Sequence, residues 1–232
     1  MSERRGSKMK DTKHRGHDEP RSLINPWEDG DYATVRALAA TLRIRDVETQ
    51  AHSERVVRFS RLLGRELGLN HKQMQSLEYG SLLHDIGKIG ISDAILRKPG
   101  PLTAEEWIRM REHPLLGWQI LSGIGFLEGA SRVVVQHHER WDGKGYPFGL
   151  SSTDIDRNAR IFAVADAFDA MISDRVYRRG RSFERAFAEL NSRAGQQFDP
   201  EVIESFIAIP EQEWNLADKV VAEINSTGRF LN

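Results

Sequence analysis

The stretch Leu82-Leu83-His84-Asp85-Ile86-Gly87-Lys88 places a histidine and an aspartate directly after two leucines that continue an apolar pattern. Neighbouring residues on a helix point about 100° apart, so both side chains can face one point only where the helix ends. Gly87 is suited to the left-handed conformation that closes a helix, and we expect the helix to end at Asp85. An imidazole beside a carboxylate suits a divalent metal such as Mn, Fe or Zn, although such a pair alone is more often a surface or cap pair.

The segments on both sides of this stretch have helical periodicity, and none alternates convincingly with period two. Asn70 can cap the helix that ends at Asp85, and Gly68 closes the helix before it. Thr103-Ala104-Glu105-Glu106 is a capping box, and Pro114 suits a first helical turn. The expected helices cover residues 32–45, 47–67, 70–85, 127–139, 158–173, 183–193 and 211–224, with further helices starting near 103, 114 and 199. The sequence therefore predicts an all-α, compact helical bundle without an internal repeat.

Composition limits the possible partners and cofactors. The 232 residues carry a net charge of −1, so the chain is not expected to bind nucleic-acid polymers. Because cysteine is absent, disulfides, iron–sulfur ligation and thiolate zinc sites are excluded. We find no long apolar run and no signal-peptide pattern, and therefore expect a cytoplasmic protein without a membrane span.

The chain divides into three parts. Residues 1–24 are rich in Arg, Lys, Ser and Gly, with almost no apolar side chains, and are expected to form a disordered basic tail. Residues 25–209 are expected to form the helical domain, and residues 210–232 a C-terminal helical extension. Within the domain, residues 140–157 form one long irregular segment with several glycines and a Tyr-Pro, and long loops in compact domains are often functional.

Further candidate ligands lie at helix ends or on apolar stripes. Each has an ordinary alternative: His52 could be a core histidine, and His113 could be a helix cap. Asp166 interrupts the apolar run 161–165, where a carboxylate is costly unless it is paired or binds a metal. Together the candidates suffice for two metals that share a bridging carboxylate, a kind of site that activates water and clamps a phosphoryl group. They are His52, His84, Asp85, His113, His137, His138 and Asp166.

Two motifs point to a known family. His84-Asp85 with Gly87-Lys88 is followed by His137-His138-Glu139-Arg140-Trp141-Asp142-Gly143-Lys144-Gly145-Tyr146-Pro147. Together they resemble the HD-GYP family, a branch of the HD phosphohydrolase superfamily that hydrolyses cyclic di-GMP. The resemblance runs from about residue 38 to residue 209 and implies an HD-domain helical bundle with additional C-terminal GYP helices. The chain departs from the family pattern at Ile91-Ser92 and Ile155-Asp156-Arg157, where the family often has a proline.

The resemblance also implies roles for individual residues. One metal would be held by His52, His84, Asp85 and Asp166, and the other by His113, His137 and His138, with Asp85 bridging. Glu48, one helical turn before His52, would help to hold a third metal, or is an ordinary surface residue beside Arg45. Asp85 and Lys88 are the catalytic candidates, and Lys88 would contact the scissile phosphate. The substrate's phosphates or bases would be held by Tyr146, Arg175 and Arg178.

The implied activity is that of a bacterial second-messenger phosphodiesterase with two or three divalent metals. Fe or Mn is expected, while Zn and Co are compatible with the same ligands. A hydroxide between the metals would open cyclic di-GMP to linear pGpG, GMP or both. The alternatives are a catalytically weak cyclic di-GMP sensor, a module that docks onto a diguanylate cyclase (GGDEF) domain through the Tyr146 loop, and a phosphohydrolase for another cyclic dinucleotide such as cyclic GMP–AMP. The N-terminal region is too short for the upstream sensor or receiver domain that family members usually carry.

Overall fold

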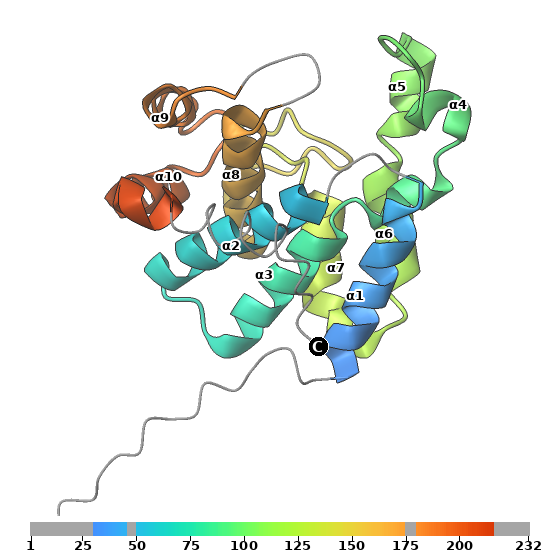
Figure 1. Ribbon diagram of the computed structural model, residues 1–232, viewed down its shortest axis with the longest axis horizontal. Helices are drawn as coiled ribbons and strands as arrows, with labels where there is room; N and C mark the ends of the chain where they lie inside the picture. Colours follow the sequence, from blue (N-terminus) through green and yellow to red (C-terminus); the bar gives the residue numbers. More distant parts are fainter. Residues whose placement is uncertain (1–29, 46–49, 175–179, 216–232) are drawn as a thin grey trace, which may run out of the picture.

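The computed structural model describes residues 30–45, 50–174 and 180–215, and these form helices and loops without a β-strand (Figure 1). The all-α prediction is therefore confirmed. The α-helices are α1 (Gly30–Arg43), α2 (Gln50–Glu66), α3 (His71–Leu83), α4 (Asp93–Leu96), α5 (Ala104–Met110), α6 (His113–Leu121), α7 (Glu128–Gln136), α8 (Arg157–Ile172), α9 (Phe183–Ser192) and α10 (Pro200–Ala208). Three short 3₁₀ helices are η2 (Ile86–Gly90), η3 (Gly125–Leu127) and η4 (Ser152–Asp154).

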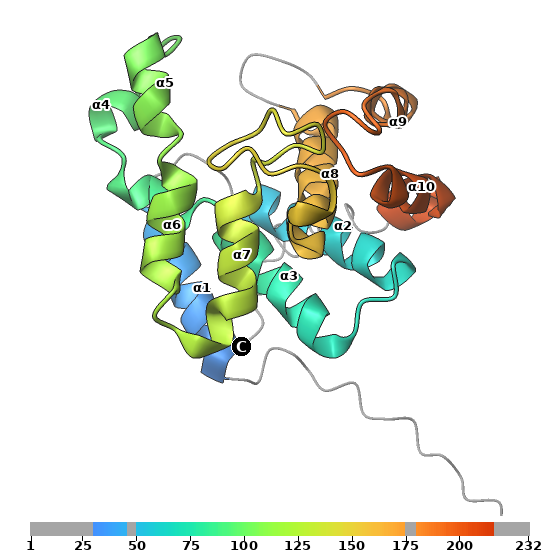
Figure 2. The same ribbon diagram turned by 180° about the vertical axis from the view of Figure 1, so that it is seen from behind.

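Two buried clusters meet along α3 and α7. The larger cluster joins α2 and α8 to α9 and α10, and the smaller joins α3 and α7 to α1. The front and back views show how these helices are arranged (Figures 1 and 2). On α7, Val133 belongs to the larger cluster and Val134 to the smaller. The ends of α3 and α7 are therefore fixed by packing on both sides, and the rings of His84 and His137, which follow these ends, lie 5.5 Å apart.

Several helix ends were predicted correctly. Asn70 and Thr103 each form a capping box, and Gly68 has a φ of 68° after α2. Pro114 lies in the first turn of α6. The Asp199 side chain caps α10 by accepting a hydrogen bond from the Glu201 amide at 2.9 Å.

The prediction for Gly87 was wrong. Gly87 lies inside η2 with an ordinary backbone conformation, because the chain passes from α3 into a 3₁₀ helix after the C-cap residue His84. The helix therefore ends at Leu83 rather than at Asp85. Glycine is required here for another reason: a Cβ atom at Gly87 would overlap the backbone of α6 at the His113 carbonyl and the Gly117 amide.

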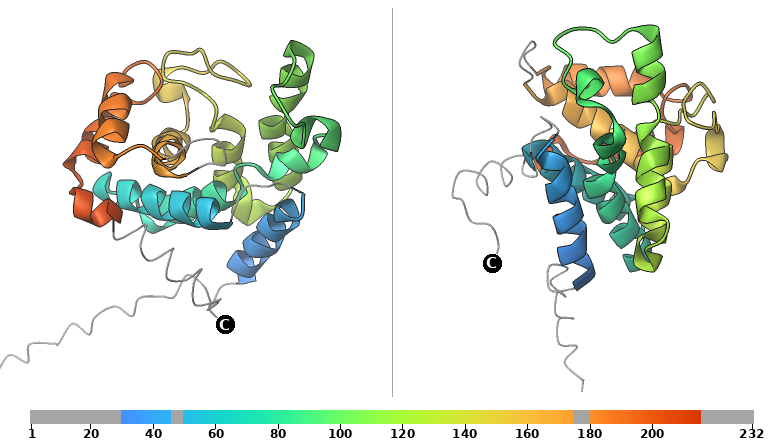
Figure 3. Two further views of the ribbon diagram at one scale, coloured as in Figure 1. Left: turned by 45° about the horizontal axis from the view of Figure 1, so that its top comes forward. Right: turned by 90° about the vertical axis from the view of Figure 1, so that its right-hand side faces the viewer.

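The helices α4 and α5 stand away from the rest of the bundle, above α6 (Figure 3). An ion pair of 2.5 Å between Lys98 and Glu106 joins the two, and Glu106 also completes the capping box of α5. We refer to residues 93–110 as the α4–α5 arm.

The remaining expectations concern the ends of the chain. Residues 1–24, the expected tail, lie outside the described residues. Of the expected extension at 210–232, residues 211–215 are described and helical, and Trp214 packs against Phe206 with ring centroids 4.6 Å apart. Across the described ranges, no helix combines the length and apolar character needed to cross a membrane.

Candidate metal centre

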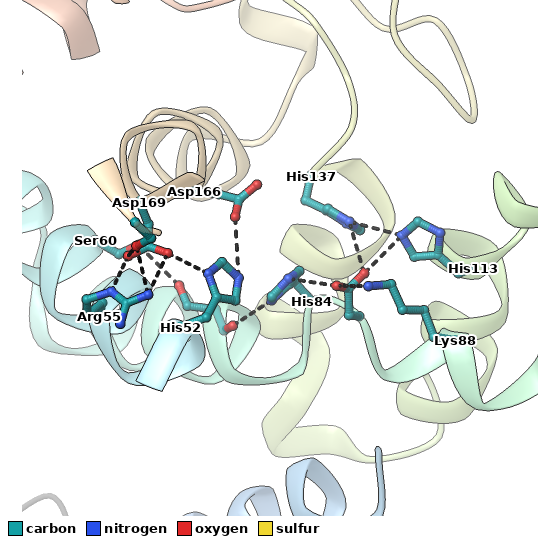
Figure 4. Close-up of polar contacts among 12 residues, drawn as sticks. His52, Arg55, Ser60, His84, Lys88, His113, His137, Asp166 and Asp169 are labelled. Atoms are coloured by element: carbon teal, nitrogen blue, oxygen red, sulfur yellow. Dashed lines mark hydrogen bonds and ion pairs between the residues drawn. The ribbon is translucent and has the colours of Figure 1, made fainter. Parts of the chain in front are cut away.

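Seven predicted ligands converge from five helices, and Figure 4 labels five of them, His52, His84, His113, His137 and Asp166. His52 lies in α2 and Asp166 in α8. His84 and Asp85 directly follow α3, and His113 opens α6. His137 and His138 directly follow α7. Most of these residues lie at helix ends, where the backbone leaves the helical path. Side chains of adjacent residues can therefore face the same point there.

The ligands form two groups with an aspartate between them. Ligand atoms of His52, His84 and Asp166 lie within 4.8 Å of one another, and so do those of His113, His137 and His138. These are the two groups that the resemblance implied.

Asp85 lies between the groups with its two oxygens directed to different sides. One oxygen, Oδ2, is 3.0 Å from His84 Nε2. The other, Oδ1, is 3.2 Å from His113 Nε2 and 3.9 Å from His137 Nε2. This geometry suits a carboxylate that bridges two ions.

Three of the histidines are oriented by the backbone of the preceding turn. Nδ1 of His84, His113 and His137 lies 2.9, 2.8 and 2.6 Å from the carbonyl oxygen of the third residue before each. A carbonyl can only accept, so Nδ1 donates and Nε2 carries the lone pair.

The Nε2 atoms of His113 and His137 lie 3.2 Å apart. With Nδ1 of both rings donating, two lone pairs would face each other at this distance. The arrangement therefore favours a cation between them, and the ligand set fits divalent metal ions.

Asp169 orients the fourth histidine. Its Oδ2 lies 2.7 Å from His52 Nδ1, and Arg55 donates to both of its oxygens. The apolar run before Asp166 predicts that this carboxylate is buried, which is wrong: the Asp166 side chain is 33% exposed and that of Asp169 only 1%. Burial raises the pKa of Asp169, but the hydrogen bonds from His52 and Arg55 outweigh it and leave the pKa below its usual value.

Replacing Asp169 with asparagine should weaken metal binding by about 10- to 100-fold, because His52 would lose the anion that fixes its tautomer and ring orientation. Titration with Mn while metal content is measured should show one weakened site and one site of near-normal affinity. Asp142→Asn is the matched control, since Asp142 pairs with Arg140 and not with a histidine. Equal affinities in Asp169→Asn and the parent protein would contradict this role.

Burial and charge keep the ligands in their metal-binding forms. Burial and the neighbouring histidines lower the pKa of His137 well below its usual value and that of His138 to about 3, so both rings are neutral. Burial raises the pKa of Asp85, but the neighbouring His84, Lys88 and His113 outweigh it, and the pKa lies well below its usual value.

Lys88 and Tyr146 border the centre. Lys88 Nζ lies 2.7 Å from Asp85 Oδ2, and the Tyr146 ring stacks on His138 with centroids 4.7 Å apart. Burial raises the pKa of Tyr146 to about 12, so the phenol keeps its proton. The expected contacts of both residues with a phosphate or base stay predictions. A cavity of about 270 Å³ opens beside Tyr146, and its lining also includes His137, His138 and Asp166.

Glu139, which the sequence analysis assigned no role, holds the loop that carries Tyr146. Its two oxygens accept from the Phe148 amide at 2.8 Å and the Leu150 amide at 3.0 Å. Glu139 is buried, and it fixes the shape of residues 140–150 in place of regular secondary structure. In the sequence, only its position directly after His138 indicated that Glu139 could contribute to the site.

Three predicted site residues, Glu48, Arg175 and Arg178, lie outside the described residues. Their assigned roles stay predictions.

Comparisons with known proteins give one matching family and several relatives. Residues 36–202 match the family described as HD domain. A Thermotoga maritima relative named cyclic di-GMP phosphodiesterase is 40% identical over 192 residues, which are 82% of this chain and 52% of the relative. A Xanthomonas campestris relative named cyclic di-GMP phosphodiesterase response regulator RpfG is 38% identical over 79% of this chain and 49% of its own length.

The chain thus spans about half the length of these curated relatives. Among solved structures, a Vibrio cholerae protein described as a cyclic GMP-AMP specific phosphodiesterase matches with a TM-score of 0.58 and 20% identity. The match covers 77% of this chain and 49% of that one, and it supports the shared fold.

Proposed function

The chain belongs to the HD-GYP branch of the HD domain family, and we propose that it is a metal-dependent phosphodiesterase that hydrolyses cyclic di-GMP to linear pGpG, GMP or both. The observation that carries the proposal is the position of Asp85 between two groups of metal ligands. These residues would hold two divalent ions, which would lower the pKa of a coordinated water and neutralise charge on a phosphoryl group.

The protein side chains prepare this centre for a phosphodiester. Asp85 contacts both ligand groups, and the neutral His137 presents its Nε2 lone pair without a competing proton. Lys88 lies 2.7 Å from Asp85, and its ammonium offsets negative charge that develops on a phosphate bound at the centre. Tyr146, whose ring stacks on His138, places an aromatic ring and a protonated phenol in the lining of the metal-centre cavity.

We propose Fe or Mn as the native metals, because histidine and carboxylate ligands suit both. A third ion held through Glu48 would distinguish a trinuclear from a dinuclear centre, and we associate it with a second hydrolysis step that converts pGpG to GMP. We also propose a cytoplasmic, bacterial setting and a GGDEF domain as a docking partner of the Tyr146 loop.

The proposal is tested by incubating the purified, reduced protein with cyclic di-GMP and separating the products by chromatography, with metal content measured on the same samples. Turnover should stop with a chelator and return with Mn or Fe, with Zn and Co as comparisons. The ratio of pGpG to GMP then reports on the second step. Nucleotide binding without product under any of the four metals would reject the proposal in favour of a sensor.

Cyclic GMP–AMP belongs in the same assay, because the Vibrio cholerae structure of related fold is described as specific for it. A higher kcat/KM for cyclic GMP–AMP than for cyclic di-GMP would change the proposed substrate but not the reaction.

A further inference from the structure

A cyclic dinucleotide is larger than the cavity at the metal centre. The cavity volume of about 270 Å³ is below the range of about 300–1,000 Å³ that encloses drug-sized ligands. A cyclic dinucleotide has two phosphodiesters and two bases. With one phosphodiester at the metal ligands, part of the ligand must therefore extend onto neighbouring surface.

Arg111 connects this cavity to a second one. It lines the metal-centre cavity, and it also lines an open hollow of about 330 Å³ together with Ala104, Trp107 and Ile108. The spacing of these four residues places them on one face of α5 and its C-cap residue, Arg111. Arg111 is the residue that the linings of the two hollows share, and the second hollow lies on an apolar helix face.

The side chain of Arg111 is available for an anion. Its guanidinium carbon lies 5.1 Å from the centre of the Tyr146 ring, whose other neighbour is His138. Two other cations near the centre are engaged, Arg140 with Asp142 and Lys88 with Asp85. For Arg111, the described part of the chain records this ring contact and no carboxylate partner.

Trp107 is a large aromatic surface one helical turn from Arg111. It is 48% exposed, and the adjacent Ile108 is 65% exposed. An exposed indole beside an uncompensated guanidinium matches the two chemical parts of a nucleotide, a planar base and a phosphate.

We propose that Arg111 and Trp107 form a second nucleotide subsite, which rests on the proposed function. Arg111 binds the phosphodiester that is not cleaved, and the Trp107 indole stacks on the adjacent base. The occupant is the distal half of the cyclic dinucleotide. The position of Arg111 in the linings of both hollows, together with its charge, favours this occupant over a protein partner.

The test compares Trp107→Ala with Trp118→Ala in the Mn-loaded protein. Trp118 is a matched control, because it is 43% exposed on α6 and lines neither cavity. Base–aromatic stacking strength implies that Trp107→Ala raises KM for cyclic di-GMP by about tenfold. We expect kcat to change by less than about threefold, since the indole does not contact the cleaved phosphate. Trp107→Phe should recover most of the affinity, and Arg111→Ala should also raise KM.

Fluorescence separates stacking from a structural effect. The chain has five tryptophans. Stopped-flow mixing of cyclic di-GMP with the Mn-loaded protein should quench tryptophan emission, and the quench should shrink in Trp107→Phe but not in Trp118→Phe. Unchanged KM and quench in the Trp107 variants, with an active parent protein, would overturn the subsite alone. A parent protein that neither binds nor cleaves the dinucleotide would overturn the proposed function and the subsite with it.

Discussion

Replacing Asp85 with asparagine should lower kcat/KM for cyclic di-GMP by about a thousandfold or more, because both ligand groups lose their shared anion. Oδ1 faces His113 and His137, and Oδ2 faces His84. Asparagine keeps the shape but has one acceptor oxygen and no charge, so it cannot neutralise two cations. Metal analysis should show a fall in bound metal together with the fall in activity.

The matched control is Asp93→Asn. Asp93 also has a cationic partner, Arg45 at 2.7 Å, but its side chain is 59% exposed and lies in the α4–α5 arm. We expect this variant to keep activity within about twofold of the parent protein, since exposed ion pairs contribute little to stability. Near-normal turnover in Asp85→Asn with a full metal load would reject Asp85 as the bridging ligand.

The helix-end positions of three candidate ligand histidines could be predicted because each carries a local signal. His84 and His137 follow apolar runs, and His113 precedes Pro114, so the sequence alone indicates helix ends at all three. The carbonyl oxygens that orient these rings also come from the preceding turn of the same segment. Local periodicity and motif therefore define this part of the site.

The roles of Asp169, which orients His52, and of Glu139, which holds the Tyr146 loop, could not be predicted from local signals. Asp166 and Asp169 lie less than one helical turn apart on α8, and periodicity does not show which of the two faces Arg55. That choice depends on contacts between α2 and α8, which join residues 114 positions apart in the sequence. Glu139 likewise bonds to backbone amides of an irregular loop, where no periodic pattern exists to guide a prediction.

Gly87 was correctly identified as a constrained position, but the physical reason assigned to it was wrong. Its position after His84-Asp85 suggested a left-handed helix end, but its backbone conformation is ordinary and its constraint is contact with α6. The contact that requires glycine at this position involves α6, which begins 26 residues later. The residues next to Gly87 in the sequence therefore do not reveal it. Substitutions can separate the two explanations.

Replacing Gly87 with alanine should destabilise the protein by roughly 3 kcal/mol and lower activity by about 100-fold. The added Cβ would overlap backbone atoms of His113 and Gly117, which no rotamer change can relieve, so α6 and its metal ligand must move. Urea unfolding and steady-state kinetics measure the two effects. Gly90→Ala in the same 3₁₀ helix is the control: its Cβ would lie 2.9 Å from Leu116 Cδ1, a flexible side-chain end, and we expect a loss below about 1 kcal/mol.

Asparagine distinguishes the two explanations for Gly87 directly. Among residues other than glycine, asparagine tolerates the left-handed conformation well, so a position that requires only positive φ should accept it. Gly68 is such a position, with a φ of 68° and no atom within 4 Å of an added Cβ, and Gly68→Asn should cost at most about 1–2 kcal/mol. Gly87→Asn should instead be at least as damaging as Gly87→Ala, because its larger side chain enters the same overlap with α6. If asparagine is tolerated at Gly87 as well as at Gly68, conformation rather than close packing is the constraint, and the link between Gly87 and the position of His113 is refuted.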